Sequence, residues 1–209
     1  MAAPAVSKLT IYGDDVSGNC LKVRWTAEHH GVDFDWVKID VFAGDAQTDD
    51  FLAINPIGLV PLARWPDGRS LPESNAIMLY MAEEAGSEWI PSKPFERAQM
   101  MSWLFWEQYS HEPYIAVRRA RLTYRGLSED ELDPELYAKG RRALGIMEMQ
   151  LTYTDWLVGE AMTLADVALV AYTRVAHEGG FDLAEFPAVQ RWVIRTEAAL
   201  GLPHLQQAA

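Results

Sequence analysis

The signals for β-strands in this sequence end near residue 85, and everything after that point has the pattern of helices. Before it, short runs with alternating apolar side chains are separated by helical segments, in the order βαβαββα. After it, apolar residues recur at helical spacing. A chain with this change is expected to fold as a small α/β domain followed by an all-α helical bundle. We predict a first domain over residues 1–86, a linker over 87–94 and a helical domain over 95–209.

The first half contains a strand, a helix and a second strand in succession, which predicts parallel pairing through a right-handed crossover. Pro66-Asp67-Gly68 between two short runs predicts a hairpin turn, because proline presets φ and glycine accepts a positive φ. The predicted strands cover residues 8–12, 34–41, 59–64 and 69–71, and the predicted helices cover 20–30 and 75–85, with a helical turn within 51–58.

The second half begins with one long predicted helix over residues 95–122. Asp133 followed by Pro134 is typical of a helix start, with the acid as N-cap and proline in the first turn. Thr163 and Asp166 have the spacing of a capping box. A last helix is predicted to start at Pro187 and to end near residue 201.

Charge and composition exclude several classes of function. The formal net charge of -12 disfavours binding to nucleic acid and to anionic membrane surfaces. No apolar run reaches about 18 residues, so no membrane span is expected, and the first eight residues lack the pattern of an export signal. The single cysteine excludes an intramolecular disulfide and a multi-cysteine zinc site. We expect a cytoplasmic protein without a metal or a prosthetic group.

The loop over residues 14–20 joins a strand to the start of a helix, where unpaired amides and the helix dipole favour an anion. Ser17 is placed to offer its hydroxyl to such an anion, or to act simply as the N-cap. Cys20 lies in the first helical turn, where the pKa of a thiol can fall. It also shares an apolar face with Val23 and Ala27, which favours a buried, inert thiol.

Two further segments have the chemistry of a peptide-binding site. Pro61 after Val60 marks an edge or a special turn, and a cis bond there would turn the main chain of Val60 outward, ready to pair with an extended peptide. Ser74 opens a helix, so its hydroxyl and the first amides fit a carboxylate. Glu73 can bind an ammonium beside that carboxylate. Alternatively, these two residues are only a helix cap and an exposed acid.

The aromatic residues within 103–114 occupy too many faces of a helix for one core stripe. Some of them must meet the other domain, a partner subunit or an apolar ligand. His111 and Glu112 have no second ligand at helical spacing, so we expect a structural or surface role for them rather than a metal site.

These segments, in this order, resemble the cytosolic glutathione transferases. The resemblance covers residues 8–202 and is carried by Asn55-Pro56-Ile57-Gly58-Leu59-Val60-Pro61, by Glu73-Ser74-Asn75-Ala76-Ile77, and by Gly159 with Thr163-Leu164-Ala165-Asp166. The residues from Ser17 to Val23 are similar to those of bacterial serine-type members near the theta and beta-like groups. The resemblance implies a thioredoxin-like first domain and favours a cis bond before Pro61.

The resemblance also implies roles for individual residues. Val60 would pair with the cysteinyl unit of glutathione, Glu73 and Ser74 would hold its γ-glutamyl end, and Ser17 would face its sulfur. The expected activity is conjugation of the cosubstrate glutathione to a small hydrophobic electrophile in detoxification. The family further implies a homodimer. We expect the electrophile to contact the helical domain at Trp106, Tyr109 and Tyr114.

Two departures from the family pattern keep other interpretations open. Gly58 and Leu59 offer only main chain for the glycyl carboxylate of glutathione, where many members have a polar side chain. Asn19 and Cys20 are alternative catalytic residues beside Ser17. Through Cys20 the chain would be a glutathione-dependent thiol–disulfide reductase or peroxidase. A non-catalytic protein that binds ligands or partners is the third possibility.

Overall fold

The computed structural model describes residues 7–205. The chain divides into two compact units, one ending at Ser87 and one beginning at Glu88. The outer ends of the two predicted domains, residues 1–6 and 206–209, lie outside the described residues, and so does most of the N-terminal stretch that lacks the export-signal pattern.

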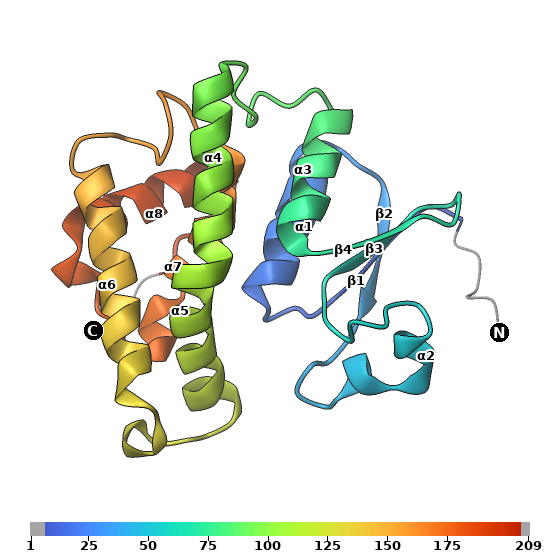
Figure 1. Ribbon diagram of the computed structural model, residues 1–209, viewed down its shortest axis with the longest axis horizontal. Helices are drawn as coiled ribbons and strands as arrows, with labels where there is room; N and C mark the ends of the chain where they lie inside the picture. Colours follow the sequence, from blue (N-terminus) through green and yellow to red (C-terminus); the bar gives the residue numbers. More distant parts are fainter. Residues whose placement is uncertain (1–6, 206–209) are drawn as a thin grey trace. The chain divides into compact units, whose positions relative to one another are not determined.

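The first unit has the predicted order βαβαββα, and the thioredoxin-like prediction is confirmed. A 3-10 turn at Asp45–Gln47 precedes the second helix. The elements are β1 (Leu9–Gly13), α1 (Gly18–His29), β2 (Phe34–Lys38), α2 (Asp49–Leu52), β3 (Leu62–Arg64), β4 (Ser70–Pro72) and α3 (Ser74–Glu84) (Figure 1).

The four strands form one mixed sheet in the order β2-β1-β3-β4. Strands β1 and β2 are parallel, as the crossover predicted, with Tyr12 opposite Val37. Strand β3 is antiparallel to both β1 and β4, so Leu62 lies between Tyr12 and Pro72. The end of β1, the start of β3 and the end of β4 therefore meet at one edge of the sheet.

The sheet is covered on both faces. Leu62 packs with Phe51 of α2 on one face, and Tyr12 joins that cluster. Ile11 and Ala63 alternate with these residues and are completely buried. Helices α1 and α3 lie side by side on the face opposite α2 (Figure 1).

Strand β2 is shorter than the predicted run over 34–41 and ends at Lys38. The main-chain N–H of Ile39 still donates to Gly13 (2.9 Å). The next two N–H groups bond instead to carboxylates, that of Asp40 to Asp45 and that of Val41 to Asp14, both at 3.0 Å. Side chains have replaced the neighbouring strand as acceptors, so the ladder stops.

The second unit is all-helical. Its α-helices are α4 (Pro94–Trp106), α5 (Glu112–Arg119), α6 (Pro134–Leu151), α7 (Leu164–Thr173) and α8 (Pro187–Ala199). π-helical turns cover Glu107–His111 and Ala120–Tyr124, and 3-10 turns cover Glu129–Glu131, Ala176–Gly179 and Leu183–Glu185. Within residues 7–205 no helix is both long enough and apolar enough to cross a membrane.

The stretch predicted as helical over 95–122 is helical from Pro94 to Tyr124, but two π-helical turns interrupt the α-helix. Pro113 explains the first interruption. Proline has no N–H to donate to the carbonyl four residues back, and its ring collides with that carbonyl. The wider π turn directly before it removes the collision while the chain continues in a helical direction.

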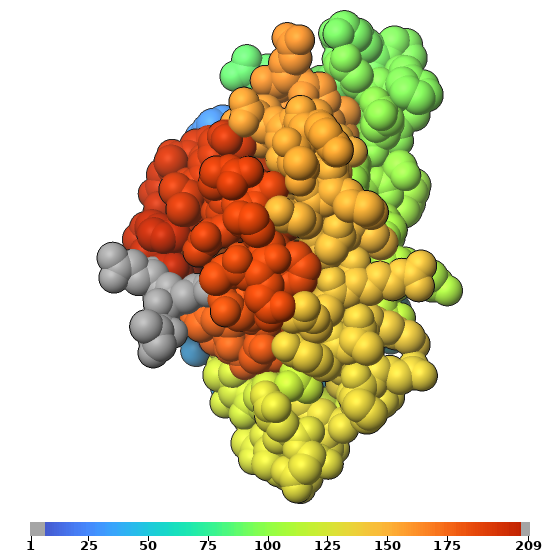
Figure 2. Space-filling view, turned by 90° about the vertical axis from the view of Figure 1, so that its left-hand side faces the viewer, coloured from blue at the N-terminus to red at the C-terminus, as the bar shows by residue number. Residues whose placement is uncertain are grey.

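The predicted helix starts in the second unit are confirmed. The side chain of Asp133 accepts from the N–H of Glu135 (2.9 Å) at the start of α6. Thr163 and Asp166 form the capping box of α7. Trp89, from the stretch predicted as linker, is 3% exposed, and its carbonyl accepts from Leu164 (3.1 Å). Figure 2 shows α6 and α8 side by side on one face of this unit.

Candidate functional site

The first unit brings four of the predicted site residues to one edge of its sheet. Ser17 follows β1, Val60 precedes β3, and Glu73 and Ser74 follow β4. Because Leu62 lies opposite both Tyr12 and Pro72, these strand ends are neighbours in the sheet. The starts of α1 and α3, which pack together, lie at this same edge.

Ser17 is the N-cap residue of α1 and has an extended backbone (φ -78°, ψ 118°). Its carbonyl accepts from the N–H of Cys20 (3.0 Å) and of Leu21 (2.9 Å), which starts the helical ladder. Among the described residues, its side chain does not cap the helix. The hydroxyl therefore lies at the positive N-terminal end of α1 and does not accept a hydrogen bond from the first amides of that helix.

Cys20 is completely buried. Burial raises the pKa of the Cys20 thiol to about 11, against the opposing effects of hydrogen bonds to Ser17 and to the main chain of Asp14. The thiol is therefore protonated at neutral pH, and it has no access to solvent. This environment fits the inert thiol that the apolar face predicted and is unfavourable for a nucleophile.

Asn19 and Ser74 link the starts of the two helices. The Ser74 hydroxyl donates to the side-chain oxygen of Asn19 at 3.2 Å, across 55 residues of sequence. Ser74 is 4% exposed and is the first residue of α3 rather than its N-cap, a position that Glu73 takes. The hydroxyl predicted to meet a carboxylate thus already contacts Asn19, and the main-chain amides of α3 remain at the helix end.

Glu73 has an unusual backbone conformation, with φ 71° and ψ 109°. It is the one non-glycine residue with a positive φ in the part of the chain that the structure describes. Residues that have a Cβ rarely adopt this backbone conformation, and such strain tends to occur at functional sites. Glu73 is exposed and directly precedes the first residue of α3.

The loop before β3 is held by side chains that fix its main chain. Asn55 is buried and donates to the carbonyl of Leu59 (2.7 Å), and Gln47 donates to the carbonyl of Gly58 (2.8 Å). The Val60–Pro61 bond is cis, in agreement with the resemblance. The main chain of Val60 makes no hydrogen bond with any residue in 7–205. It is therefore able to pair with another extended chain.

The predicted aromatic lining belongs to the helical unit. Trp106 packs edge-to-face against Trp103 (centroids 5.0 Å apart), and Lys139 lies over the ring of Tyr114 at 5.4 Å. Tyr109, on the first π turn, is 83% exposed. A substrate-lining role for Trp106, Tyr109 and Tyr114 stays a prediction.

His111 has a structural environment. It is completely buried, and its Nε2 lies 2.9 Å from the hydroxyl of Thr173. That hydroxyl donates to the carbonyl of Leu169 (2.7 Å), so Nε2 is the donor to Thr173. Among the described residues, no group of three or more His, Cys, Asp or Glu side chains could hold a metal ion.

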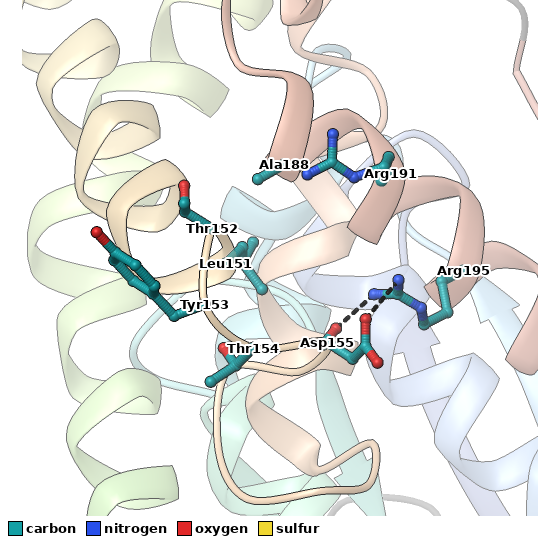
Figure 3. A pocket seen from close by; sticks show the side chains of 8 residues that line it. All are labelled: Leu151, Thr152, Tyr153, Thr154, Asp155, Ala188, Arg191 and Arg195. Carbon is teal, nitrogen blue, oxygen red and sulfur yellow. Dashed lines mark hydrogen bonds and ion pairs between the residues drawn. The ribbon is translucent and has the colours of Figure 1, made fainter.

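A hollow of about 230 Å³ lies between the turn after α6 and helix α8 (Figure 3). One of its two arginines is paired with an acid. Arg195 bonds to the side chain (2.7 Å) and carbonyl (2.6 Å) of Asp155, while Glu148 accepts from the first amides of α8. The lining residues of the hollow are Leu151, Thr152, Tyr153, Thr154, Asp155, Ala188, Arg191 and Arg195.

Asp14 is the residue near this site that sequence reasoning did not single out. It is 3% exposed, and its carboxylate accepts main-chain N–H groups on both oxygens. The sequence shows two consecutive acids after Gly13, but nothing in it indicates that the first is buried while Asp15 is exposed.

Comparisons with known proteins agree with this geometry. The family model for the glutathione S-transferase N-terminal domain matches residues 16–84, and that for the C-terminal domain matches 101–199. A crystal structure of a glutathione S-transferase from Pseudomonas fluorescens is 45% identical, with a TM-score of 0.89, over 96% of this chain and 100% of that one.

Two curated relatives are more distant. Disulfide-bond oxidoreductase YfcG of Escherichia coli is 28% identical over 86% of this chain and 87% of its own length. Protein URE2 of Eremothecium gossypii is 27% identical over 88% of this chain, which spans 63% of that protein. Both family models and the close structural relative cover the two units of the fold. The chain therefore belongs to the glutathione S-transferase family.

Proposed function

We propose that this protein is a glutathione transferase that conjugates the thiolate of glutathione to small hydrophobic electrophiles. The observation that carries the proposal is the convergence of Ser17, Val60, Glu73 and Ser74 at one edge of the sheet. Each of these residues offers a group that one part of the tripeptide requires.

The binding roles follow from the groups on offer. The main chain of Val60 pairs with the cysteinyl unit of glutathione as a short added strand. The main-chain amides at the start of α3, including that of Ser74, hold the α-carboxylate of the γ-glutamyl end. Glu73 binds the ammonium group beside that carboxylate.

The reactive step requires the thiol to be ionised. A free thiol with a pKa of about 8.5 is only a few per cent thiolate at neutral pH. A hydrogen bond to a charged acceptor contributes roughly 1.5–3 kcal/mol, which corresponds to about one to two pKa units. The Ser17 hydroxyl, at the positive end of α1, can supply such a bond to the glutathione sulfur.

The contact of Ser17 with Cys20 is compatible with this role. A hydroxyl both donates and accepts hydrogen bonds. Because burial keeps Cys20 protonated, its S–H can donate to the Ser17 oxygen. In this arrangement Ser17 accepts from Cys20 and donates its own hydroxyl proton to the glutathione sulfur.

The chemistry itself is a displacement or an addition. The thiol proton leaves to solvent, and the sulfur uses an electron pair to form a C–S bond with the electrophilic carbon. With a chlorinated nitroaromatic substrate, chloride departs with the electrons of the C–Cl bond. Trp106, Tyr109 and Tyr114 of the helical unit are the proposed contacts of the hydrophobic substrate.

Two measurements test the proposal together. Calorimetric titration with glutathione measures binding, and conjugation of a chlorinated nitroaromatic measures turnover. We expect binding and turnover, with turnover at neutral pH reduced roughly 10- to 100-fold in Ser17→Ala, as the hydrogen-bond energy implies. Binding without conjugation would instead indicate a ligand-binding protein, and no binding would overturn the proposal.

A second candidate is glutathione-dependent disulfide reduction, which the similarity to disulfide-bond oxidoreductase YfcG favours. Since Cys20 is buried with a raised pKa, the attacking group would be glutathione itself. One glutathione thiolate would cleave the disulfide to a mixed disulfide, and a second would release oxidised glutathione. A disulfide-reduction assay on wild type and Cys20→Ser separates the two routes. Activity is kept in Cys20→Ser if glutathione attacks the disulfide directly, and it is lost if Cys20 is the attacking group.

A homodimer is part of the same proposal. Phe95 and Phe105 of α4 are 76% and 69% exposed, and large apolar side chains of this kind support a subunit contact. Sedimentation velocity measures the oligomeric state directly.

A further inference from the structure

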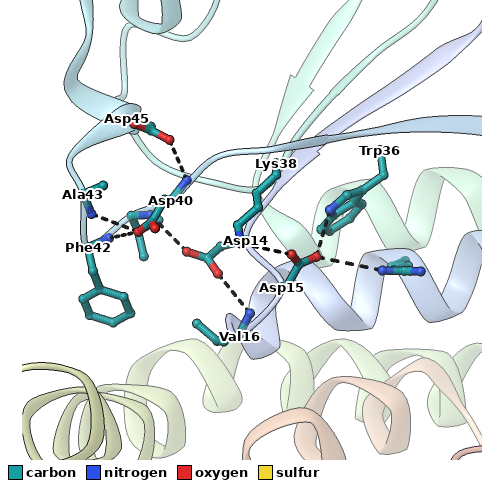
Figure 4. A network of polar contacts seen from close by, with 11 residues as sticks. Asp14, Asp15, Val16, Trp36, Lys38, Asp40, Phe42, Ala43 and Asp45 are labelled. Carbon is teal, nitrogen blue, oxygen red and sulfur yellow. Dashed lines mark hydrogen bonds and ion pairs between the residues drawn. The ribbon is translucent and has the colours of Figure 1, made fainter.

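Asp14 joins the loop that carries Ser17 to a second loop of the first unit (Figure 4). Its Oδ1 accepts from the N–H of Val16 (2.9 Å), directly before Ser17. Its Oδ2 accepts from the N–H of Val41 (3.0 Å), 27 residues along the chain. The Asp14 carbonyl also lies 3.4 Å from the N–H of Ser17. One buried carboxylate thus holds the main chain of both loops.

The second loop, over residues 40–45, is held in place by its own hydrogen bonds, so Asp14 bonds to a main chain that is already fixed. The Asp40 carboxylate accepts from the N–H groups of Phe42 (3.0 Å) and Ala43 (2.9 Å). The N–H of Asp40 donates to Asp45 (3.0 Å). Because these bonds hold the turn over residues 40–45, the position of Val41 is set independently of the Ser17 loop.

Asp15, the neighbour of Asp14, has a different environment. It accepts from the indole N–H of Trp36 (3.1 Å) and lies 3.5 Å from the Lys38 ammonium and 4.0 Å from the Arg24 guanidinium. Its side chain is 46% exposed, so its contacts are solvated. Asp15 therefore provides a matched control, with the same charge in the same loop but without buried main-chain bonds.

We propose that Asp14 is a positioning residue that holds the Ser17 hydroxyl where it can donate to the glutathione sulfur. The inference rests on the proposed function, since it assigns to Asp14 an effect that acts through Ser17. Asp14 itself touches no reacting atom in this account.

The charge of Asp14 and its positioning act on a bound thiol in opposite directions. A negative carboxylate near the sulfur disfavours a thiolate, so loss of the charge alone would lower the pKa of the bound thiol. Loss of the loop geometry would weaken the hydrogen bond from Ser17 and would raise that pKa. The sign of the shift therefore distinguishes the two effects.

The test uses Asp14→Asn and Asp14→Glu, with Asp15→Asn as control, each in the wild-type and the Ser17→Ala background. The pKa of glutathione bound to each protein is read from the ultraviolet absorbance of the thiolate. We expect Asp14→Asn to raise it by at least about half a unit and to lower turnover at neutral pH about three-fold or more. Asp14→Glu keeps the charge but displaces the carboxylate, so we expect it also to raise the pKa of the bound thiol. Asp15→Asn should leave the pKa unchanged.

The double-mutant cycle decides whether Asp14 acts through Ser17. We expect Asp14→Asn not to raise the thiol pKa any further once Ser17 is alanine, because only the loss of its charge can then act, and that loss lowers the pKa. A lowered pKa in Asp14→Asn, or effects that add in the double variant, would overturn the inference.

Amide hydrogen exchange at Val16 and Val41 provides a readout that does not depend on glutathione. We expect faster exchange at both amides in each Asp14 variant, with thermal unfolding confirming that the variant is folded. If exchange is faster in the Asp14 variants but the thiol pKa is unchanged, while Ser17→Ala still raises that pKa, the positioning role of Asp14 is overturned. If wild type and Ser17→Ala bind glutathione with the same thiol pKa, the role of Ser17 in the proposed function fails instead, and if neither binds glutathione, the proposed function itself fails.

Discussion

Glu73 combines a strained backbone with a carboxylate proposed to bind glutathione, and we predict that Glu73→Gly makes the protein more stable while weakening its affinity. With φ 71° and ψ 109°, the Cβ of Glu73 is held in a region that few residues with a side chain occupy. Such a conformation costs about 1–3 kcal/mol. Glycine adopts it freely but loses more chain entropy on folding, about 0.5–1 kcal/mol. The expected net gain is about 1 kcal/mol.

The loss of affinity has a separate origin. Removing the carboxylate leaves the ammonium of the γ-glutamyl group without its counter-charge. A charge-assisted bond at an exposed position contributes about 1–2 kcal/mol, so we expect glutathione to bind roughly 5- to 30-fold more weakly.

Glu73→Gln and Glu73→Ala separate the two effects, since both keep the Cβ and remove the charge. For Glu73→Gly we expect a rise in Tm of about 2–4 °C, and for the other two variants no rise. All three should lose glutathione affinity in calorimetric titration. A Glu73→Gly protein that is no more stable than Glu73→Ala would refute the argument from strain, and unchanged affinity in all three would refute the role of the carboxylate.

Two further predictions concern buried groups. Asp166 accepts four hydrogen bonds, from Leu157, Trp192 and twice from Thr163, so Asp166→Ala should lower the free energy of unfolding by at least about 3 kcal/mol in urea titration. Asp155→Ala, which loses only an exposed ion pair with Arg195, should cost less than about 1 kcal/mol, and equal losses would contradict this account. Because the pKa of Cys20 is raised to about 11, iodoacetamide at pH 8 should alkylate it on the order of 100-fold more slowly than a free thiol. Full reactivity in the native protein would contradict the burial, and urea should restore the normal rate.

Local chemistry made most of the fold predictable. The Asp133-Pro134 start and the Thr163–Asp166 box each depend on residues within one helical turn, and both form as expected. The parallel pairing of β1 and β2 followed from the order strand, helix, strand. The π turn before Pro113 was missed, because a proline inside a helical pattern indicates a distortion without specifying which one.

The candidate site was predictable only in part, because its details depend on partners far away in sequence. Ser17, Val60, Glu73 and Ser74 were found from loop chemistry and the family resemblance. The buried position of Asp14 depends on Val41, and the Ser74 hydroxyl bonds to Asn19 across 55 residues. The sequence does not indicate the positive φ of Glu73, because the residue that usually adopts such a φ is glycine or asparagine rather than glutamate.

The ultraviolet titration of the thiolate of bound glutathione, in wild type and in Ser17→Ala, tests the central claim most directly. The account predicts a pKa well below the value of about 8.5 for a free thiol in wild type, and a value about one to two units higher in Ser17→Ala. Identical titrations of the two proteins, at concentrations where calorimetry shows both to be saturated with glutathione, would contradict it.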